Sequence, residues 1–108
     1  MMTPVGIVVA DQKTIFVSDS TARRIIRVDS RTGAQTVVSA EGSLATPFGL
    51  ALQSKHDLLV GDPDAFELAG AVIHIDLRSG AQSPVATGSG DFVNYRCVAV
   101  VQSASTQP

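Results

Sequence analysis

An all-β fold made of two copies of one antiparallel unit is predicted by three observations. The first is a repeated hairpin, which reads IIRVDSRTGAQTVVSA at residues 25–40 and VIHIDLRSGAQSPVAT at residues 72–87. The second is a fixed spacing, because equivalent residues lie 47 positions apart in the hairpin (29→76) and 43 apart before it (19→62). The third is that no segment shows a 3.6-residue apolar period long enough for a stable helix. Together these features indicate a repeat protein.

The first unit is expected to contain four strands, at residues 6–10, 15–18, 24–29 and 34–40. The first of them is nearly all apolar, which is typical of a short strand buried on both faces. The turn before the fourth strand has a clear chemical basis. Asp29 can accept hydrogen bonds from local backbone N–H groups, and Gly33 can adopt the positive φ that closes such a hairpin.

The second unit repeats this order, and four additional residues fall within segment 63–70, which has room for one helical turn at most. A third unit begins at residues 94–100 and stops after one strand, and the polar segment 102–108 follows as a tail. The alternation of apolar residues along the strands predicts a shared core. Its expected members are Ile7, Val9, Phe16, Ile26, Val28, Leu50, Leu52, Leu59, Ile73, Ile75 and Val98.

A four-stranded antiparallel unit of roughly 43–47 residues has the size of one β-propeller blade. The runs P-x-G-[IL], [IL]-[FV]-V-x-D and I-x-[VI]-D-x-x-[TS]-G-A-Q resemble blades of the NHL-repeat proteins. They are also similar to the six-bladed superfamily of senescence marker protein, gluconolactonase and luciferin-regenerating enzyme. The resemblance covers about residues 4–101 and implies one partial propeller domain. Its expected parts are a blade at about 4–40, a blade at about 47–87, the start of a third at about 94–101 and the tail at 102–108.

The resemblance implies about six blades, whereas this chain supplies two and one further strand. Two blades alone leave an apolar sheet face exposed on each side, and such faces normally mark interfaces. Two explanations are open. Either the chain is a piece of a longer propeller whose other blades are missing here, or three copies form a six-bladed ring in which the strand near Val98 completes a neighbour's blade.

Composition excludes several kinds of partner. The formal net charge is −2, Trp is absent and no basic run exists, so nucleic acid is not expected. No apolar stretch approaches the roughly 20 residues of a membrane span, and the N-terminus lacks the basic region of a signal peptide. A soluble chain is therefore expected, and the compartment stays open because a longer parent could be exported. Cys97 is the single cysteine and is expected to be a small buried hydrophobe.

The metal-dependent lactonases of the resembled superfamily place Asn or Asp ligands just before the glycine that opens an innermost strand. The equivalent residues here are Val5, Phe48 and Tyr95, which are not ligands for a hard cation. The sequence has one acidic cluster, made of Asp62, Asp64 and Glu67, and these are candidates for binding Ca²⁺. The alternatives are a substrate-binding loop on one propeller face and a solvated turn in which Asp62 caps backbone N–H groups, as its equivalent Asp19 would.

No catalytic residues are assigned. Asp29 and Asp76 are expected to bond turn N–H groups, His74 to be a partly buried structural residue, and His56 to be exposed in a turn. The sequence therefore predicts a non-catalytic binding or scaffold module that uses loops at one end of the blades. Its ligand would be a protein or small molecule at the propeller face. Two alternatives remain: a gluconolactonase-like hydrolase or lyase with catalytic residues on absent blades, and a ring-shaped homo-oligomer that binds a ligand.

Overall fold

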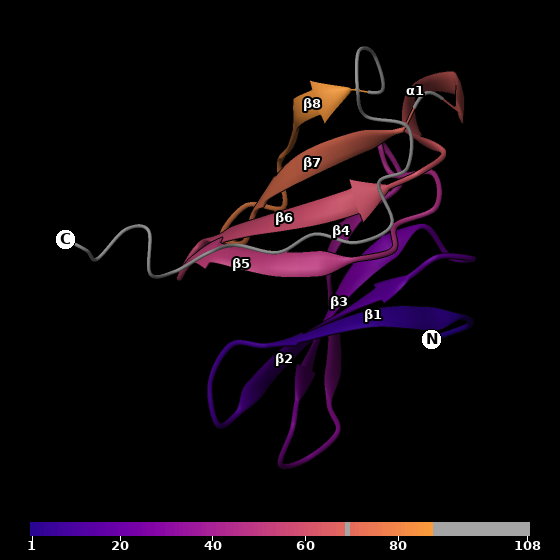
Figure 1. The fold of residues 1–108 in the computed structure, drawn as a ribbon. Coiled ribbons are helices and arrows are strands. Elements are labelled where there is room, and N and C mark those ends of the chain that lie inside the picture. The colour runs from indigo at the N-terminus through magenta and orange to yellow at the C-terminus, as the bar shows by residue number, and fades with distance from the viewer. Residues whose placement is uncertain (69, 88–108) are drawn as a thin grey trace, which may run out of the picture.

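The computed structural model describes residues 1–68 and 70–87, and it contains two four-stranded antiparallel sheets (Figure 1). In each sheet the strands follow one another in chain order, which confirms the predicted all-β class. The elements of the first sheet are β1 (Pro4–Val9), β2 (Thr14–Asp19), β3 (Arg24–Asp29) and β4 (Gln35–Ala40). Those of the second are β5 (Leu50–Ser54), β6 (Asp57–Asp62), β7 (Ala71–Asp76) and β8 (Gln82–Thr87), with the single helical turn α1 (Ala65–Leu68) before β7.

The two sheets are built with the same register, as the sequence repeat predicts. One row of paired residues across the first three strands of each sheet shows this, namely Ile7–Val17–Ile26 and Leu50–Val60–Ile73. The irregularity in the third strand also recurs, between Ile25 and Ile26 and between Val72 and Ile73. Among the described residues, no helix is long and apolar enough to cross a membrane.

The repeated turn has the predicted chemistry in both sheets. The Asp29 carboxylate accepts the backbone N–H of Arg31 at 2.8 Å, and the Asp76 carboxylate accepts that of Arg78 at 2.9 Å. Gly33 and Gly80 have φ of 81° and 80°, a left-handed conformation that glycine adopts without a steric penalty. The role predicted for Asp29 and Asp76 in the turns is therefore confirmed.

The sheets pack face to face around one hydrophobic core. The inner face of the first sheet contributes Phe16 and Ile25, and the inner face of the second contributes side chains from β5, β6 and β7. The latter are Leu50, Leu52, Leu58, Val60, Ile73 and Ile75. Gly6 lies where the two backbones approach closely, because a Cβ atom there would collide with the Phe48 carbonyl oxygen. The Ser18 hydroxyl donates to this same oxygen at 2.5 Å.

Gln82, the glutamine of the second Gly-Ala-Gln motif, joins the two sheets through polar contacts. Its Oε1 atom accepts the backbone N–H of Ser43 at 2.7 Å, and its Nε2 atom donates to the Ser39 hydroxyl at 2.9 Å. The equivalent residue of the first motif is Gln35, which is exposed and makes no side-chain hydrogen bond in the described part of the chain. The motif therefore builds a turn in both sheets and an inter-sheet contact in one.

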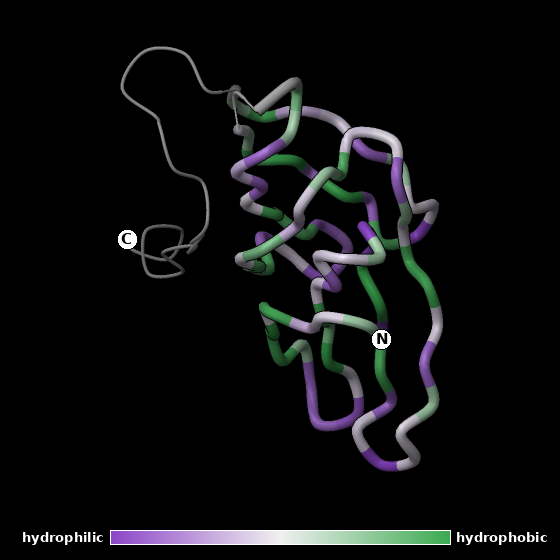
Figure 2. The backbone as a smooth tube through the Cα atoms, turned by 90° about the vertical axis from the view of Figure 1, so that its right-hand side faces the viewer, coloured by the Kyte–Doolittle hydropathy of each residue, from purple (hydrophilic) through white to green (hydrophobic). Residues whose placement is uncertain are grey.

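The predicted core is wrong at β1. Ile7 and Val9 are 63% and 66% exposed, so this strand is not buried on both faces. They lie on the outer face of the first sheet, which comprises Ile7, Val9, Ile15, Val17, Ile26 and Val28. No sheet of the described chain covers that face, so apolar character alone could not bury it. Figure 2 shows the hydrophobic segments of both sheets.

The other predicted core residues have mixed outcomes. Phe16, Ile26, Leu50, Ile73 and Ile75 are buried as predicted. Val28, Leu52 and Leu59 are only half-buried, and the fully buried Ile25 and Leu58 were not predicted. Val98 lies outside the described residues, as do Tyr95, Cys97 and the expected third unit and tail.

Candidate functional site

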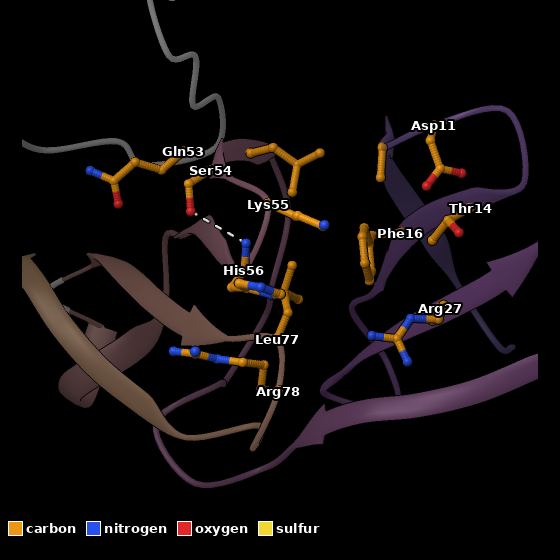
Figure 3. Close-up of a pocket in the computed structure, with 12 residues that line it drawn as sticks. Asp11, Thr14, Phe16, Arg27, Gln53, Ser54, Lys55, His56, Leu77 and Arg78 are labelled. Carbon is orange, nitrogen blue, oxygen red and sulfur yellow. Dashed lines mark hydrogen bonds between the residues drawn. The ribbon is translucent and has the colours of Figure 1, made fainter. Parts of the chain in front are cut away.

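A cleft of about 790 Å³ opens between the two sheets, at the end where β1 turns into β2 and β5 turns into β6. Figure 3 shows Phe16 and Arg27 of the first sheet on one side of it and Lys55, His56, Leu77 and Arg78 of the second on the other. Phe16 and Leu77 are buried core residues, so the cleft reaches down to the apolar contact between the sheets. Its volume lies in the range of small-molecule sites.

Arg27 is the cation best placed to hold a ligand. Its guanidinium lies 5.5 Å from the centroid of the Phe16 ring, within the range of a cation–π contact. Arg27 is half-buried and has no carboxylate partner among the described residues. An anion that entered the cleft would therefore meet donors that are already positioned by an aromatic ring and are not occupied by an acid.

The remaining charges make the cleft basic. Lys55 lines it without an ion pair in the described chain, whereas Arg78 is 3.4 Å from Asp76 and is partly neutralised by it. Asp11 is the one acidic lining residue. The Asp11 carboxylate accepts the backbone N–H of Lys13 at 2.7 Å, and this hydrogen bond lowers the pKa of that carboxyl. Three cations thus face one carboxylate in a cleft with an apolar floor.

Ser54 and His56 also line the cleft, but they do not form a nucleophile and base. The Ser54 hydroxyl donates to Asp57, and the other Asp57 oxygen lies 2.7 Å from Nε2 of His74. The Ser54 hydroxyl, and after it His74, lower the Asp57 pKa. In this series of hydrogen bonds the Asp57 carboxylate lies between Ser54 and His74. A catalytic triad instead needs a histidine between the serine and the acid. His74 is half-buried and bonded across the sheet, and His56 is exposed, as predicted for both.

The acidic cluster lies at the opposite end of the sheets from the cleft. Asp62 is fully buried, and its oxygens accept the backbone N–H groups of Ala45, Thr46 and Asp64 at 2.8 to 3.1 Å. Asp19 is buried in the same way and accepts from Met2, Thr3 and Ala22. The predicted capping role of both residues is confirmed, whereas the expectation of a solvated turn is wrong at Asp62, which is buried. The side chain of Glu67 lies outside the described part of the structure.

The residues at the positions of the expected metal ligands show whether the described part of the chain fits a metal ion. Val5 and Phe48 have no donor atom at the positions where the resembled lactonases place ligands, and Tyr95 is not described. Both oxygens of Asp62 already bind backbone N–H groups. Within residues 1–68 and 70–87, no three metal-ligating side chains come together. The described residues do not fit a hard divalent cation, so no chemical step is derived through one.

Asp19 gives the fold a predictable response to acid. Burial raises the Asp19 pKa, but the backbone N–H groups of Thr3, Met2 and Ala22, with Arg24, outweigh it and hold the pKa below the ordinary 3.8. A carboxyl with a lowered folded-state pKa contributes stability above its unfolded pKa, and that contribution is lost as the pH falls through the folded value. The free energy of unfolding should therefore decrease below about pH 4.

The Asp19→Asn variant tests this assignment. It is expected to be less stable than the wild type at neutral pH, because a neutral asparagine side chain replaces the charged carboxylate that accepts hydrogen bonds from the backbone N–H groups. Its unfolding free energy should also fall less steeply between about pH 5 and pH 2. Urea unfolding at a series of pH values measures both quantities. An unchanged slope would show that other carboxyls dominate the acid response.

In comparisons with known proteins, no family model and no curated protein matches this chain. The functional argument therefore rests on the residues and their geometry. Sequence reasoning missed the cleft because its two walls come from segments about 40 residues apart. The signal that was present is the adjacent pair Lys55 and His56 in the β5–β6 turn together with Arg27, whose repeat equivalent is His74.

Proposed function

We propose that the chain is a non-catalytic binding or scaffold module, built of two consecutive NHL-like propeller blades, whose ligand enters the cleft between the blades. The four-stranded meander, the repeat and the face-to-face packing support the blade assignment. The cleft supports the binding assignment, because it combines an apolar floor with a basic rim. The observation that carries the proposal is Arg27, held on Phe16 with no acidic partner in the described chain.

The ligand that fits this arrangement carries a carboxylate beside an apolar group. The carboxylate would accept hydrogen bonds from Arg27 and attract Lys55, and the apolar part would cover Phe16 and Leu77 at the floor. An acidic small molecule and the acidic C-terminus of a peptide both have this chemistry. Turn residues at one end of the sheets line the cleft together with the strand residues Phe16 and Arg27.

N-acetylphenylalanine, which has a carboxylate and an aromatic ring, is a suitable probe, and its uncharged amide is the matched control. We expect saturable binding of the acid, seen as chemical-shift changes of Phe16, Arg27 and Leu77 in NMR spectra, and much weaker binding of the amide. The Arg27→Gln variant should bind the acid about tenfold more weakly, because one charge-assisted hydrogen bond is lost. Arg31→Gln removes the same charge from a turn outside the cleft and should bind like the wild type.

Two results would contradict this function. One is the absence of saturable shifts at the cleft residues with the acid. The other is an equal loss of affinity in Arg27→Gln and Arg31→Gln, which would indicate attraction by overall charge and not a built site. Circular dichroism of both variants checks that the loss does not come from unfolding.

A further inference from the structure

The internal repeat shows what the outer face of the first sheet is shaped to contact. Its six residues, Ile7, Val9, Ile15, Val17, Ile26 and Val28, are the repeat equivalents of Leu50, Leu52, Leu58, Val60, Ile73 and Ile75. In the second sheet those positions form the inner face and pack on the first sheet. The same side-chain pattern is therefore used as an interface once and, within residues 1–68 and 70–87, is left without a partner sheet once.

Exposure at matched positions makes the contrast clear. Leu50 is 8% exposed, whereas its equivalent Ile7 is 63% exposed. Leu58 and Ile75 are fully buried, whereas Ile15 and Val28 are half-buried. Val17 and Ile26, in the two central strands, are buried in both settings. A hollow of about 370 Å³ lies over this face, lined by Val5, Ile7, Ile15, Val17 and Val28 among others.

A glutamine and a glycine of the repeat also differ between the two units in their contacts with a neighbouring sheet. Gln82 bonds to the loop of the preceding sheet, whereas Gln35 is exposed. At Gly80 a Cβ atom would collide with the Val38 carbonyl oxygen of the first sheet, whereas nothing lies within 4 Å of that position at Gly33. In the described part of the chain, these repeat positions contact a neighbouring sheet in the second unit and have no such neighbour in the first.

The surface that would complete this contact exists on the outer face of the second sheet. On the first sheet, the inner-face residues are Val8, Phe16, Ser18, Ile25 and Arg27. Their repeat equivalents on the second sheet are Ala51, Leu59, Gly61, Val72 and His74. The order of apolar, apolar, small, apolar and basic residues is kept. Val38 packs against the core, whereas its equivalent Val85 is 61% exposed.

We propose that a second copy of this chain covers the outer face of the first sheet, through the outer face of its own second sheet. The contact reproduces between copies the sheet-to-sheet packing seen within one chain. It is a head-to-tail interface, because the two surfaces differ, and it either closes into a ring or continues as a filament. This inference goes beyond the proposed ligand site, since neither Ile7 nor Val85 lines the cleft.

The proposal is tested by mass measurement on the full chain, using light scattering over a range of concentrations. The wild type should have a mass above one chain. Ile7→Asp and Val85→Asp each place a charge in one half of the interface and should each be monomeric, with association at least about 100-fold weaker. Phe66→Asp replaces an exposed apolar residue of α1 outside the repeated positions, and it should keep the wild-type mass.

A mixture of the two variants gives the sharpest result. Ile7→Asp retains an intact second-sheet face and Val85→Asp retains an intact first-sheet face, so an equimolar mixture should form a dimer with one chain of each. A contact between two identical faces would instead leave one variant self-associating and the mixture without a new species. If Ile7→Asp fails to fold by circular dichroism, Val9→Asp makes the same change at a position that is 66% exposed.

The contradicting outcomes are distinct from those for the ligand site. A wild type that is monomeric at every concentration would overturn the proposal and leave a further repeat unit of a longer chain as the occupant. Retention of the wild-type mass by Val85→Asp would exclude the head-to-tail arrangement. Neither outcome affects the binding of N-acetylphenylalanine in the cleft, so the two proposals can fail separately.

Discussion

Replacing Asp62 with alanine is expected to destabilise the fold by about 3 kcal/mol. The carboxylate is fully buried and accepts backbone N–H groups of Ala45 and Thr46, which belong to the connection between the sheets, and of Asp64 in the following turn. Alanine would leave these donors without their acceptor in a place that water reaches poorly. Urea unfolding followed by circular dichroism measures the change in unfolding free energy.

Asp64→Ala is the matched control for this prediction. Asp64 is the neighbouring acid of the cluster and is half-buried, and its carboxylate makes no hydrogen bond in the described part of the chain. Its removal should change the stability by less than about 0.5 kcal/mol. Equal effects of the two substitutions would contradict the capping role of Asp62.

The same pair of variants separates capping from calcium binding. If Asp62 acts through backbone N–H groups, its removal destabilises the protein equally in chelator and in millimolar calcium. A calcium site would behave differently, because a bound ion stabilises only the folded state and its loss would appear only when calcium is present. Stabilisation of the wild type by calcium that disappears in both variants would therefore restore the cluster as a cation site.

The sequence was sufficient for the local structure because the repeat presents each turn twice. Asp29 and Gly33 recur as Asp76 and Gly80, and the structure gives both pairs the same hydrogen bond and the same positive φ. Strand positions followed from alternation, and the capping role of Asp62 followed from its equivalence to Asp19. These features depend on residues close in sequence or on the repeat itself.

The exposure of β1 and the presence of the cleft could not be predicted from neighbouring residues or from the repeat. Ile7 has the side chain of a core residue, and whether it is buried depends on a neighbouring sheet that alternation does not reveal. The cleft depends on where Arg27 of one sheet lies relative to Lys55 of the other. Their relative placement depends on how the two sheets pack, and the close approach of the backbones at Gly6 and Phe48 is one contact of that packing.

The two backbones also approach closely at Gly80, so a substitution there should lower the stability strongly. Gly33, its repeat equivalent, provides an internal control. Gly80→Ala is expected to destabilise the fold by about 3 kcal/mol. About 1 kcal/mol comes from placing a side chain at positive φ, and the rest comes from the collision of the new methyl group with the Val38 carbonyl oxygen. Gly33 has nearly the same φ, but a methyl group there would meet no neighbouring atom. Gly33→Ala should therefore cost only the roughly 1 kcal/mol that comes from the positive φ.

The comparison should be made in the Ile7→Asp background, where the chain is expected to be monomeric and no neighbouring copy approaches Gly33. Thermal and urea unfolding then report the packing within one chain. Equal losses of unfolding free energy in the two alanine variants would contradict a close contact between Gly80 and the Val38 carbonyl oxygen of β4. In the wild-type background at high concentration, Gly33→Ala should additionally weaken self-association, because a second copy would bring its own β8 against Gly33 as β4 lies against Gly80.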